Sequence, residues 1–351
     1  MIRADNLALT GSLLDAPGAF AAHVGQIYSS FDVVDLPDGG VRVSFTSGSI
    51  SFAPGEQAMV IAVTAVSATD LFVLREAVAG LVDGFDATLA ARLIWDRPLA
   101  KLQVPPNFRQ GRVVAISHPG VGYVRLRIAA DHLGAFAVSG LHLRLLLPPE
   151  GRAVVWPSVS EAGRTVWPTG ADKLHDPVYT IRAIDPAAGW LEVDIFLHGK
   201  GRTCRWAENV QRGAVVGLIG PGGGYLPMAR HLVLAGDETA LPAIARILET
   251  AAPDTLGDAI ILVPNAAAMQ PLIAPPEVQV IWLFRTAGDT LESGLTTVAM
   301  PRAGLAGGRQ LWIAGERSEC QRLRGQFNVA SGWAKSDTTI AGYWTAGDVQ
   351  A

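Results

Sequence analysis

The spacing of apolar and polar residues marks the first hundred residues as a separate folding unit. Residues 14–28 carry apolar side chains at helical spacing, residues 41–66 alternate in strand fashion through a Gly-Ser and a Pro-Gly turn, and residues 68–82 return to helical spacing. This pattern predicts a small α+β domain over residues 1–96. Residues 97–107 contain Pro98, Pro105 and Pro106, which break both periodicities, so we expect a linker there.

From residue 108 the pattern becomes a run of short strands bounded by proline or glycine. We expect strands at residues 111–117, 121–129, 141–147, 177–184, 190–198 and 214–219. Strands with few helical interruptions predict a small antiparallel β-barrel, here over residues 108–228. Tyr179 and Thr180 are neighbours on one of these strands, so they can reach the same ligand only at a strand edge or a bend.

After residue 229 strands alternate with helices. We expect strands at residues 231–235, 259–263, 278–284, 310–314 and 338–344, and a helix at residues 318–327. Asp237, Glu238 and Thr239 are suited to open another helix, whose buried stripe would be Leu241, Ile244, Ala245 and Leu248. The alternation predicts a parallel sheet flanked by helices, a nucleotide-binding type of domain over residues 229–351. The expected fold is therefore multidomain, with α+β, β-barrel and α/β parts.

Composition narrows the function classes. A length of 351 residues and a hydrophobic content of 49% are enough for two or three cores. The formal net charge of −4 gives no reason to expect a nucleic-acid partner. The longest uncharged stretch, residues 259–276, contains four prolines and makes a poor membrane span. With two cysteines and no N-terminal signal pattern, we expect a cytoplasmic protein without membrane insertion, of unknown oligomeric state.

Residues 175–224 contain the parts of a cofactor cradle. A tyrosine face can lie against a flat ring, a threonine hydroxyl can reach a ring nitrogen, and the glycines of His198-Gly199-Lys200-Gly201 and of residues 220–224 can approach a pyrophosphate. Residues 236–239, in contrast, have one glycine and two acids where a tight dinucleotide site has a Gly-x-Gly-x-x-Gly turn. Any nucleotide on that domain is therefore expected to bind loosely.

Six short motifs in order resemble the siderophore-interacting proteins, which are flavin-dependent ferric-siderophore reductases of the ferredoxin-reductase superfamily. The motifs are Tyr-Thr-x-Arg at 179–182, FLHGxG at 196–201, RWA at 205–207, Gly-Pro-Gly-Gly at 220–223, AGDETALPAI at 235–244 and GYW at 342–344. The resemblance covers residues 108–347. The layout of the N-terminal stretch resembles a small domain of unknown role that accompanies some of these proteins.

The resemblance implies FAD, a nicotinamide cofactor (NADPH or NADH), and reduction of a ferric siderophore or other ferric chelate with release of Fe(II). It assigns cofactor binding to Tyr179, Thr180, Arg182, His198, Gly199, Gly201, Arg205, Trp206, Gly222, Gly223, Asp237, Thr239, Ala240, Tyr343 and Trp344. It assigns substrate binding to His142 and Arg144, and it assigns no catalytic side chain and no metal ligand. Tyr179 would stack on the isoalloxazine ring, and Tyr343 and Trp344 would close over it.

Plainer roles remain open for the same residues. Tyr179 would otherwise be a buried barrel tyrosine, and Arg144 an exposed position of an alternating strand. Tyr343 and Trp344 would pack as an ordinary C-terminal strand, and residues 237–239 would only cap a helix.

Two departures from the family pattern concern cations. Pro177 stands where the family has an arginine that neutralises the flavin pyrophosphate, and Thr345 replaces a C-terminal arginine. Substitute cations are available at Arg182, Lys200, Arg202 and Arg205. The alternative function is therefore a flavin-poor binding module for an iron chelate or a small anion, without reductase activity.

Overall fold

The computed structural model divides into two compact units, and each of them is built from two separate stretches of chain. It describes residues 7–29, 31–45, 47–97, 103–138, 140–160, 163–199, 201–223 and 226–347. Unit 1 comprises Met1–Phe108 and Val155–Gly170, and unit 2 comprises Arg109–Val154 and Ala171–Ala351. The return of residues 155–170 to unit 1 was not predicted from the sequence. Among the described residues, no helix is long and apolar enough to span a membrane.

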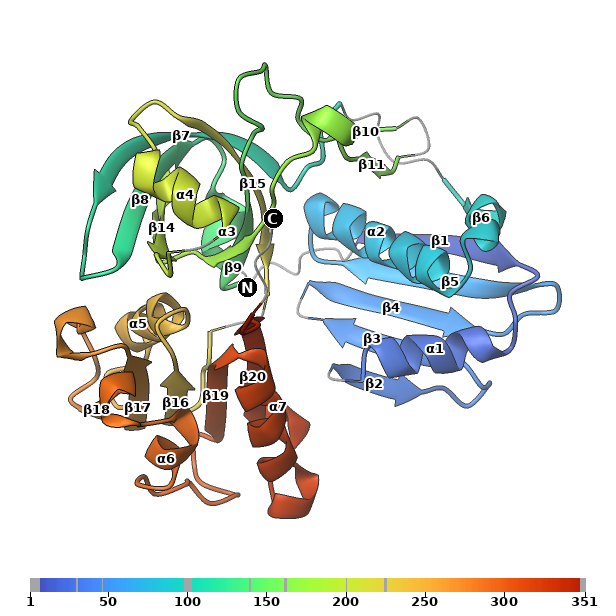
Figure 1. The fold of residues 1–351 in the computed structure, drawn as a ribbon. Helices are drawn as coiled ribbons and strands as arrows, with labels where there is room; N and C mark the ends of the chain where they lie inside the picture. Colours follow the sequence, from blue (N-terminus) through green and yellow to red (C-terminus); the bar gives the residue numbers. More distant parts are fainter. Residues whose placement is uncertain are drawn as a thin grey trace. The chain divides into compact units, whose positions relative to one another are not determined.

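Unit 1 is an α+β sandwich. Its antiparallel sheet has the order β2-β3-β4-β5-β1-β6, and helices α1 and α2 lie across one face (Figure 1). The elements are β1 Leu7–Leu14, α1 Ala19–Ile27, β2 Asp32–Asp35, β3 Val41–Phe45, β4 Gly48–Ala53, β5 Ala58–Ala65, α2 Ala68–Phe85 and β6 Leu93–Trp95. Phe20 and Val24 of α1 pack with Val78 and Val82 of α2 in one apolar core. The predicted α+β class is confirmed, although Leu14 belongs to a strand and the first helix begins only after Pro17-Gly18.

A short hairpin completes unit 1. Strands β10 Ser158–Val159 and β11 Thr165–Val166 pair antiparallel. Arg164, beside the second strand, forms ion pairs with Glu76 and Asp83 of helix α2, and the Thr165 amide donates to Glu76 at 3.0 Å. The hairpin lies in the sequence between barrel strands β9 and β12, but it belongs to unit 1 and contacts helix α2.

The first part of unit 2 is the predicted antiparallel β-barrel. Its strand order is β12-β9-β15-β7-β8-β14-β13. The elements are β7 Phe108–Ser117, β8 Tyr123–Ala130, α3 Gly134–Val138, β9 His142–Leu146, β12 Val178–Thr180, β13 Ala183–Asp185, β14 Trp190–Phe196, α4 Arg202–Asn209 and β15 Val215–Gly222. The alternating apolar residues Val124, Leu126 and Ile128 of β8 point into the barrel core.

The strand expected at residues 177–184 is two strands in the structure. β12 ends at Thr180 and pairs with β9, whereas β13 begins at Ala183 and pairs with β14. Between them the Ile181 amide donates to the Leu141 carbonyl at 2.9 Å and the Arg182 amide to the Glu192 carbonyl at 2.8 Å. The chain therefore crosses from one end of the strand order to the other here, which closes the barrel.

The second part of unit 2 is the predicted parallel sheet, with strand order β18-β17-β16-β19-β20. The elements are β16 His231–Gly236, α5 Leu241–Thr250, β17 Leu256–Val263, β18 Glu277–Phe284, α6 Leu291–Leu295, β19 Arg309–Glu316, α7 Arg317–Gln326 and β20 Thr338–Trp344. Helix α5 covers one face, and α6 and α7 cover the other. The predicted stripe Leu241, Ile244, Ala245 and Leu248 is fully buried.

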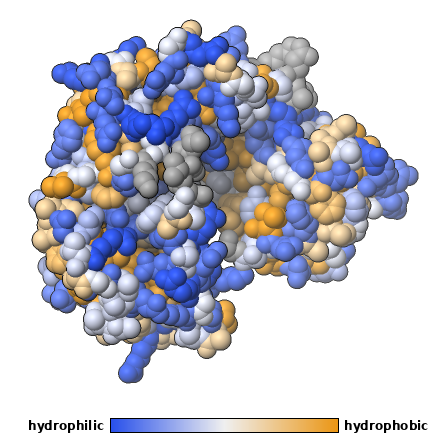
Figure 2. All heavy atoms as spheres, in the orientation of Figure 1, coloured by the Kyte–Doolittle hydropathy of each residue, from blue (hydrophilic) through white to orange (hydrophobic). Residues whose placement is uncertain are grey.

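The expectation that residues 237–239 open the helix needs a correction. The helix starts at Leu241 with Ala240 as its N-cap, and no side chain caps it. The Asp237 carboxylate instead accepts from the amide and the hydroxyl of Thr239, so it stabilises the preceding turn. On the face of the molecule seen in Figure 2, apolar residues are scattered among hydrophilic ones. The large apolar side chains gather mainly in the buried cores described above.

Candidate functional site

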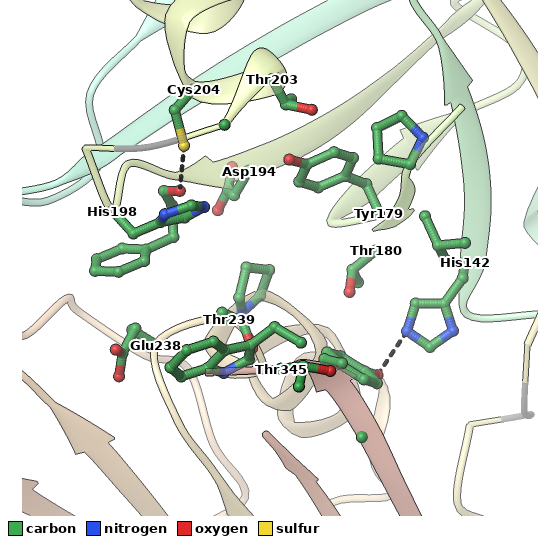
Figure 3. A pocket seen from close by; sticks show the side chains of 18 of the residues that line it. His142, Tyr179, Thr180, Asp194, His198, Thr203, Cys204, Glu238, Thr239 and Thr345 are labelled. Carbon is green, nitrogen blue, oxygen red and sulfur yellow. Dashed lines mark hydrogen bonds between the residues drawn. The ribbon is translucent and has the colours of Figure 1, made fainter. Parts of the chain in front are cut away.

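A cavity of about 980 Å³ lies in unit 2 between the barrel and the parallel sheet. Figure 3 shows Tyr179, Thr203 and Cys204 on the barrel wall and Glu238, Thr239 and Thr345 on the opposite wall. Ten of the site residues predicted from the sequence line this cavity: His142, Arg144, Tyr179, Thr180, His198, Gly201, Gly223, Thr239, Tyr343 and Trp344. The fold therefore brings together residues that are up to two hundred positions apart in the sequence.

Tyr179 and Thr180 both line the cavity, and strand β12, which carries them, is short. It ends where the chain changes from pairing with β9 to pairing with β14. β12 stops at Thr180, directly before the crossing that closes the barrel. This is the bend that the sequence required if two adjacent strand residues were to face one ligand. Burial raises the pKa of the Tyr179 phenol, and a hydrogen bond with Thr203 acts in the opposite direction. Tyr179 is therefore a neutral aromatic surface at physiological pH.

The loop after β14 places the start of helix α4 at the cavity. Gly199 and Gly201 have φ angles of +74° and +86°, which favour glycine, and Gly201 is the N-cap of α4. Arg202, Thr203 and Cys204 of the first turn line the cavity. The Thr203 hydroxyl lies 2.7 Å from His175 Nε2, which holds its orientation. Free amides and an arginine at a helix N-terminus favour an anion in this part of the cavity.

Several predicted residues lie outside the cavity lining. The Arg182 guanidinium binds both carboxylate oxygens of Glu249 on α5, at 2.6 and 2.7 Å. Arg205 of α4 is exposed, and Trp206 packs against the barrel core. The other residues that do not line the cavity are Gly199, Gly222, Asp237 and Ala240, and Lys200 lies outside the described residues.

Gly223 is a glycine because a side chain at this position would collide with His142. Its φ angle is +76°, and a Cβ at this position would lie 2.2 Å from Nδ1 of His142. The glycine therefore leaves space for the His142 ring.

His142 joins the barrel to the C-terminal strand. Its Nε2 lies 2.6 Å from the Tyr343 hydroxyl, and the two rings pack edge to face. Burial, together with the nearby charge of Arg246, lowers the pKa of His142 to about 4, so the ring is neutral at physiological pH. Next to Tyr343, the Trp344 indole donates to Asp237 at 2.7 Å. The two aromatic residues therefore have fixed positions on the cavity wall.

The carboxyl ends of the parallel strands form the lower wall. Glu238 follows β16 and binds Arg285, which follows β18, at 3.1 Å. Burial raises the pKa of Glu238, and the neighbouring Asp237 adds to the effect. In a doubly wound sheet, ligands bind outside the carboxyl ends where the strand order reverses, here between β16 and β19.

Among the described residues three arginines line the cavity. The sequence predicted substrate binding for Arg144 and named Arg202 as a substitute cation. Arg144 forms an ion pair with Asp176, and its side chain is 51% exposed. Arg202 donates to the Pro148 carbonyl at 3.3 Å. Arg317, the first residue of α7, was missed. Its position directly after a strand of the parallel sheet was the available signal, because side chains at such positions face the ligand edge of the sheet. Among the described residues, no group of three or more His, Cys, Asp or Glu side chains has the geometry of a metal site.

Comparisons with known proteins find similarity along this same part of the chain. The family model described as "Siderophore-interacting FAD-binding domain" matches residues 112–225, and that described as "Siderophore-interacting protein" matches residues 229–347. A ferric acinetobactin reductase of Acinetobacter baumannii is 30% identical over 67% of this chain and 77% of its own length.

Two further comparisons extend the picture. An uncharacterised protein of Mycobacterium tuberculosis is 38% identical over 48% of this chain, and the match spans 64% of that relative's length. The crystal structure of a siderophore utilization protein from T. fusca has a TM-score of 0.59 and 30% identity, over 72% of this chain and 99% of that one.

Proposed function

Because the chain belongs to the siderophore-interacting protein family, we propose that it is an FAD-dependent reductase that takes electrons from NADPH or NADH and reduces ferric siderophores or other ferric chelates. The observation that carries the proposal is the convergence of Tyr179, Thr180 and the start of helix α4 on one cavity. The reductase name of the Acinetobacter relative supports the substrate class. The expected cytoplasmic location stays a prediction.

The residues of the cavity fit FAD. A volume of about 980 Å³ is at the upper end of the range for cofactor sites. The Tyr179 ring supplies an aromatic face for a flat ring system, and Thr180 supplies a hydroxyl beside it. The N-terminus of α4 with Arg202 supplies amides and a positive charge for the pyrophosphate.

This phosphate site compensates for the missing family arginine. Pro177 lines the cavity but offers neither charge nor an amide donor. Arg182 is held by Glu249, so Arg202 is the substitute cation that faces the cavity among the described residues. A charge-assisted bond typically contributes about 1.5–3 kcal/mol, so one such bond from Arg202 can replace the one that Pro177 cannot make.

When bound, FAD would be the electron carrier, because a flavin can accept two electrons together from a nicotinamide and pass them singly to iron(III). One NAD(P)H therefore reduces two ferric ions. The carboxyl edge at Glu238 and Thr239 positions the nicotinamide cofactor loosely, since it lacks a glycine-rich cradle. His142 and Arg144 contribute to the chelate side of the cavity.

The test begins with the purified protein incubated with FAD and desalted. We expect a yellow protein whose visible flavin absorption is bleached by NADPH or NADH under anaerobic conditions and restored by a ferric chelate, with Fe(II) trapped by ferrozine. A protein that stays colourless after incubation with FAD would overturn the proposal and favour the flavin-poor binding module. Flavin that binds but is not reduced by either nicotinamide would contradict the assigned electron donor.

A further inference from the structure

Arg317 places a positive charge at the rim of the cavity. It is the first residue of α7, its side chain is exposed, and it lines the cavity beside Thr345 and Ala346. Within the described part of the chain, its guanidinium has no hydrogen bond or ion pair. Arg144 is paired with Asp176, and Arg202 is bonded to the Pro148 carbonyl. Arg317 is therefore the described arginine of the cavity whose guanidinium has neither an ion pair nor a hydrogen bond.

Arg317 lies next to the position from which a cation is missing. Strands β19 and β20 run parallel, and Glu316 pairs with Trp344. Arg317 and Thr345 are the residues that follow this pair, so they emerge side by side at the carboxyl edge of the sheet. The Glu316 carboxylate is not paired with Arg317, because it accepts from the Ser318, Glu319 and Ala346 amides at 2.7, 3.1 and 3.1 Å.

Gly342 directs Arg317 toward the edge of the sheet. A Cβ at Gly342 would lie 3.0 Å from Cα and 3.2 Å from Cβ of Arg317, so the arginine packs directly on the bare backbone of β20. β20 is the edge strand, on the far side of β19 from β16. Arg317 thus lies on the side of the cavity away from the point between β16 and β19 where the nicotinamide cofactor is expected.

We propose that Arg317 binds the negative charge of the ferric chelate and so supplies, from a neighbouring strand, the cation that Thr345 lacks. This inference rests on the proposed function for the identity of the ligand. It makes Arg317 a residue that determines specificity for anionic chelates. The attraction acts at an exposed site, so it weakens as ionic strength rises.

The test uses redox-inert gallium(III) chelates, so that binding is measured without turnover. The dianionic gallium diethylenetriaminepentaacetate and the neutral gallium tris-maltolate are titrated against the FAD-loaded protein, with tryptophan fluorescence as the readout, since Trp344 lines the cavity. Arg317→Ala is compared with Arg322→Ala, which removes the same charge from an exposed position of α7 outside the cavity. The double variant Arg317→Ala/Thr345→Arg returns the charge to the neighbouring strand.

We expect Arg317→Ala to weaken binding of the dianionic chelate about three- to tenfold at low salt, with little effect on the neutral chelate or on the Michaelis constant for NADPH. The double variant should recover most of the loss. Equal effects of Arg317→Ala and Arg322→Ala, no recovery in the double variant, or a change confined to NADPH would each overturn the proposal.

The gallium titration, together with a ferric-reduction assay of the same proteins, separates this inference from the proposed function. A wild-type protein that binds gallium chelates but reduces no ferric chelate would contradict the reductase function, while the comparison of the variants would still decide the role of Arg317. Ferric reduction with normal kinetics in Arg317→Ala would contradict the inference alone.

Discussion

A single histidine connects the stability of the molecule to pH. His142 is bonded to Tyr343, and burial lowers its pKa from 6.5 to about 4. The unfolded chain therefore takes up a proton before the folded chain does as the pH falls. The stability associated with neutral His142 is complete above about pH 6.5 and is lost as the pH falls toward 4. The loss is on the order of 2–3 kcal/mol.

The measurement is urea unfolding at pH 7 and pH 4.5. His142→Gln keeps a group that can bond to Tyr343 but does not titrate, so its stability should fall less between the two pH values than that of the wild type. Burial also lowers the pKa of His175, so the comparison of variant with wild type, and not the wild-type slope, isolates His142. His118→Gln, at an exposed position, is the matched control and should follow the wild type. Equal slopes for all three proteins would contradict the assignment.

Tyr179 is the residue through which the FAD proposal is tested most directly. If its ring packs on the flavin, Tyr179→Ala should weaken FAD binding by about 1–3 kcal/mol, because an aromatic face is lost from a folded barrel. Tyr179→Phe keeps the ring and removes the bond to Thr203, so its FAD affinity should stay near that of the wild type. Affinity is measured by fluorescence titration, and far-ultraviolet circular dichroism checks the fold. An alanine variant that is folded and binds FAD normally would refute the stacking.

At the scale of the element, the position of the β10–β11 hairpin depends on its contacts with helix α2. Arg164 bridges to Glu76 and Asp83 of α2, with side chains between 24% and 40% exposed. Because ion pairs at this exposure are weak, Arg164→Ala should lower the stability of unit 1 by only about 1 kcal/mol, while making the hairpin more sensitive to limited proteolysis. Arg152→Ala breaks a comparable exposed pair with Asp172 in unit 2 and serves as the control. Equal proteolysis of the two variants would show that the hairpin is held by other contacts.

The elements themselves were largely predictable, because their signals are local. Alternation over residues 41–66 and the stripe from Leu241 to Leu248 both correspond to buried faces in the structure. The break of the strand at Ile181 and Arg182 had no local signal, since it results from pairing with Leu141 and Glu192, which belong to two different strands. The return of residues 155–170 to unit 1 has the same origin: its ion pairs join positions some eighty residues apart in the sequence.

The residues of the candidate site also fall into those that local sequence motifs predict and those that depend on tertiary contacts. Tyr179, Thr180 and His198 follow from motif residues and lie at the cavity. Arg182 belongs to a motif too, but its charge is committed to Glu249 on a helix that the barrel sequence does not contain. Arg317 belongs to none of the motifs, and its place beside Thr345 follows only from the register of β19 with β20. Residues that act through tertiary partners are therefore the ones that sequence reasoning assigned least well.

At the scale of unit 2, three contacts hold the barrel against helix α5 and the turn before it. The Tyr123 hydroxyl donates to the Glu238 carbonyl at 2.7 Å, Arg246 donates to the Ile181 carbonyl at 2.8 Å, and Arg182 binds Glu249. Residues of both domains line the cavity, so its geometry depends on how the two domains are joined. The Arg182–Glu249 pair is the contact whose two side chains can each be removed by substitution.

The last prediction separates the role of Arg182 in joining the domains from the phosphate role implied by the family resemblance. The Arg182 and Glu249 side chains are 11% and 29% exposed and form two short bonds, so a double-mutant cycle of Arg182→Ala and Glu249→Ala should give a coupling energy of about 1–2 kcal/mol in urea unfolding. If Arg182 only joins the domains, both single variants should weaken FAD binding to the same modest extent, because each loosens the same cavity wall. If it also binds phosphate, Arg182→Ala should weaken FAD much more than Glu249→Ala, and the excess should shrink with added salt. We expect the first result, since both guanidinium Nη groups are already bonded to Glu249.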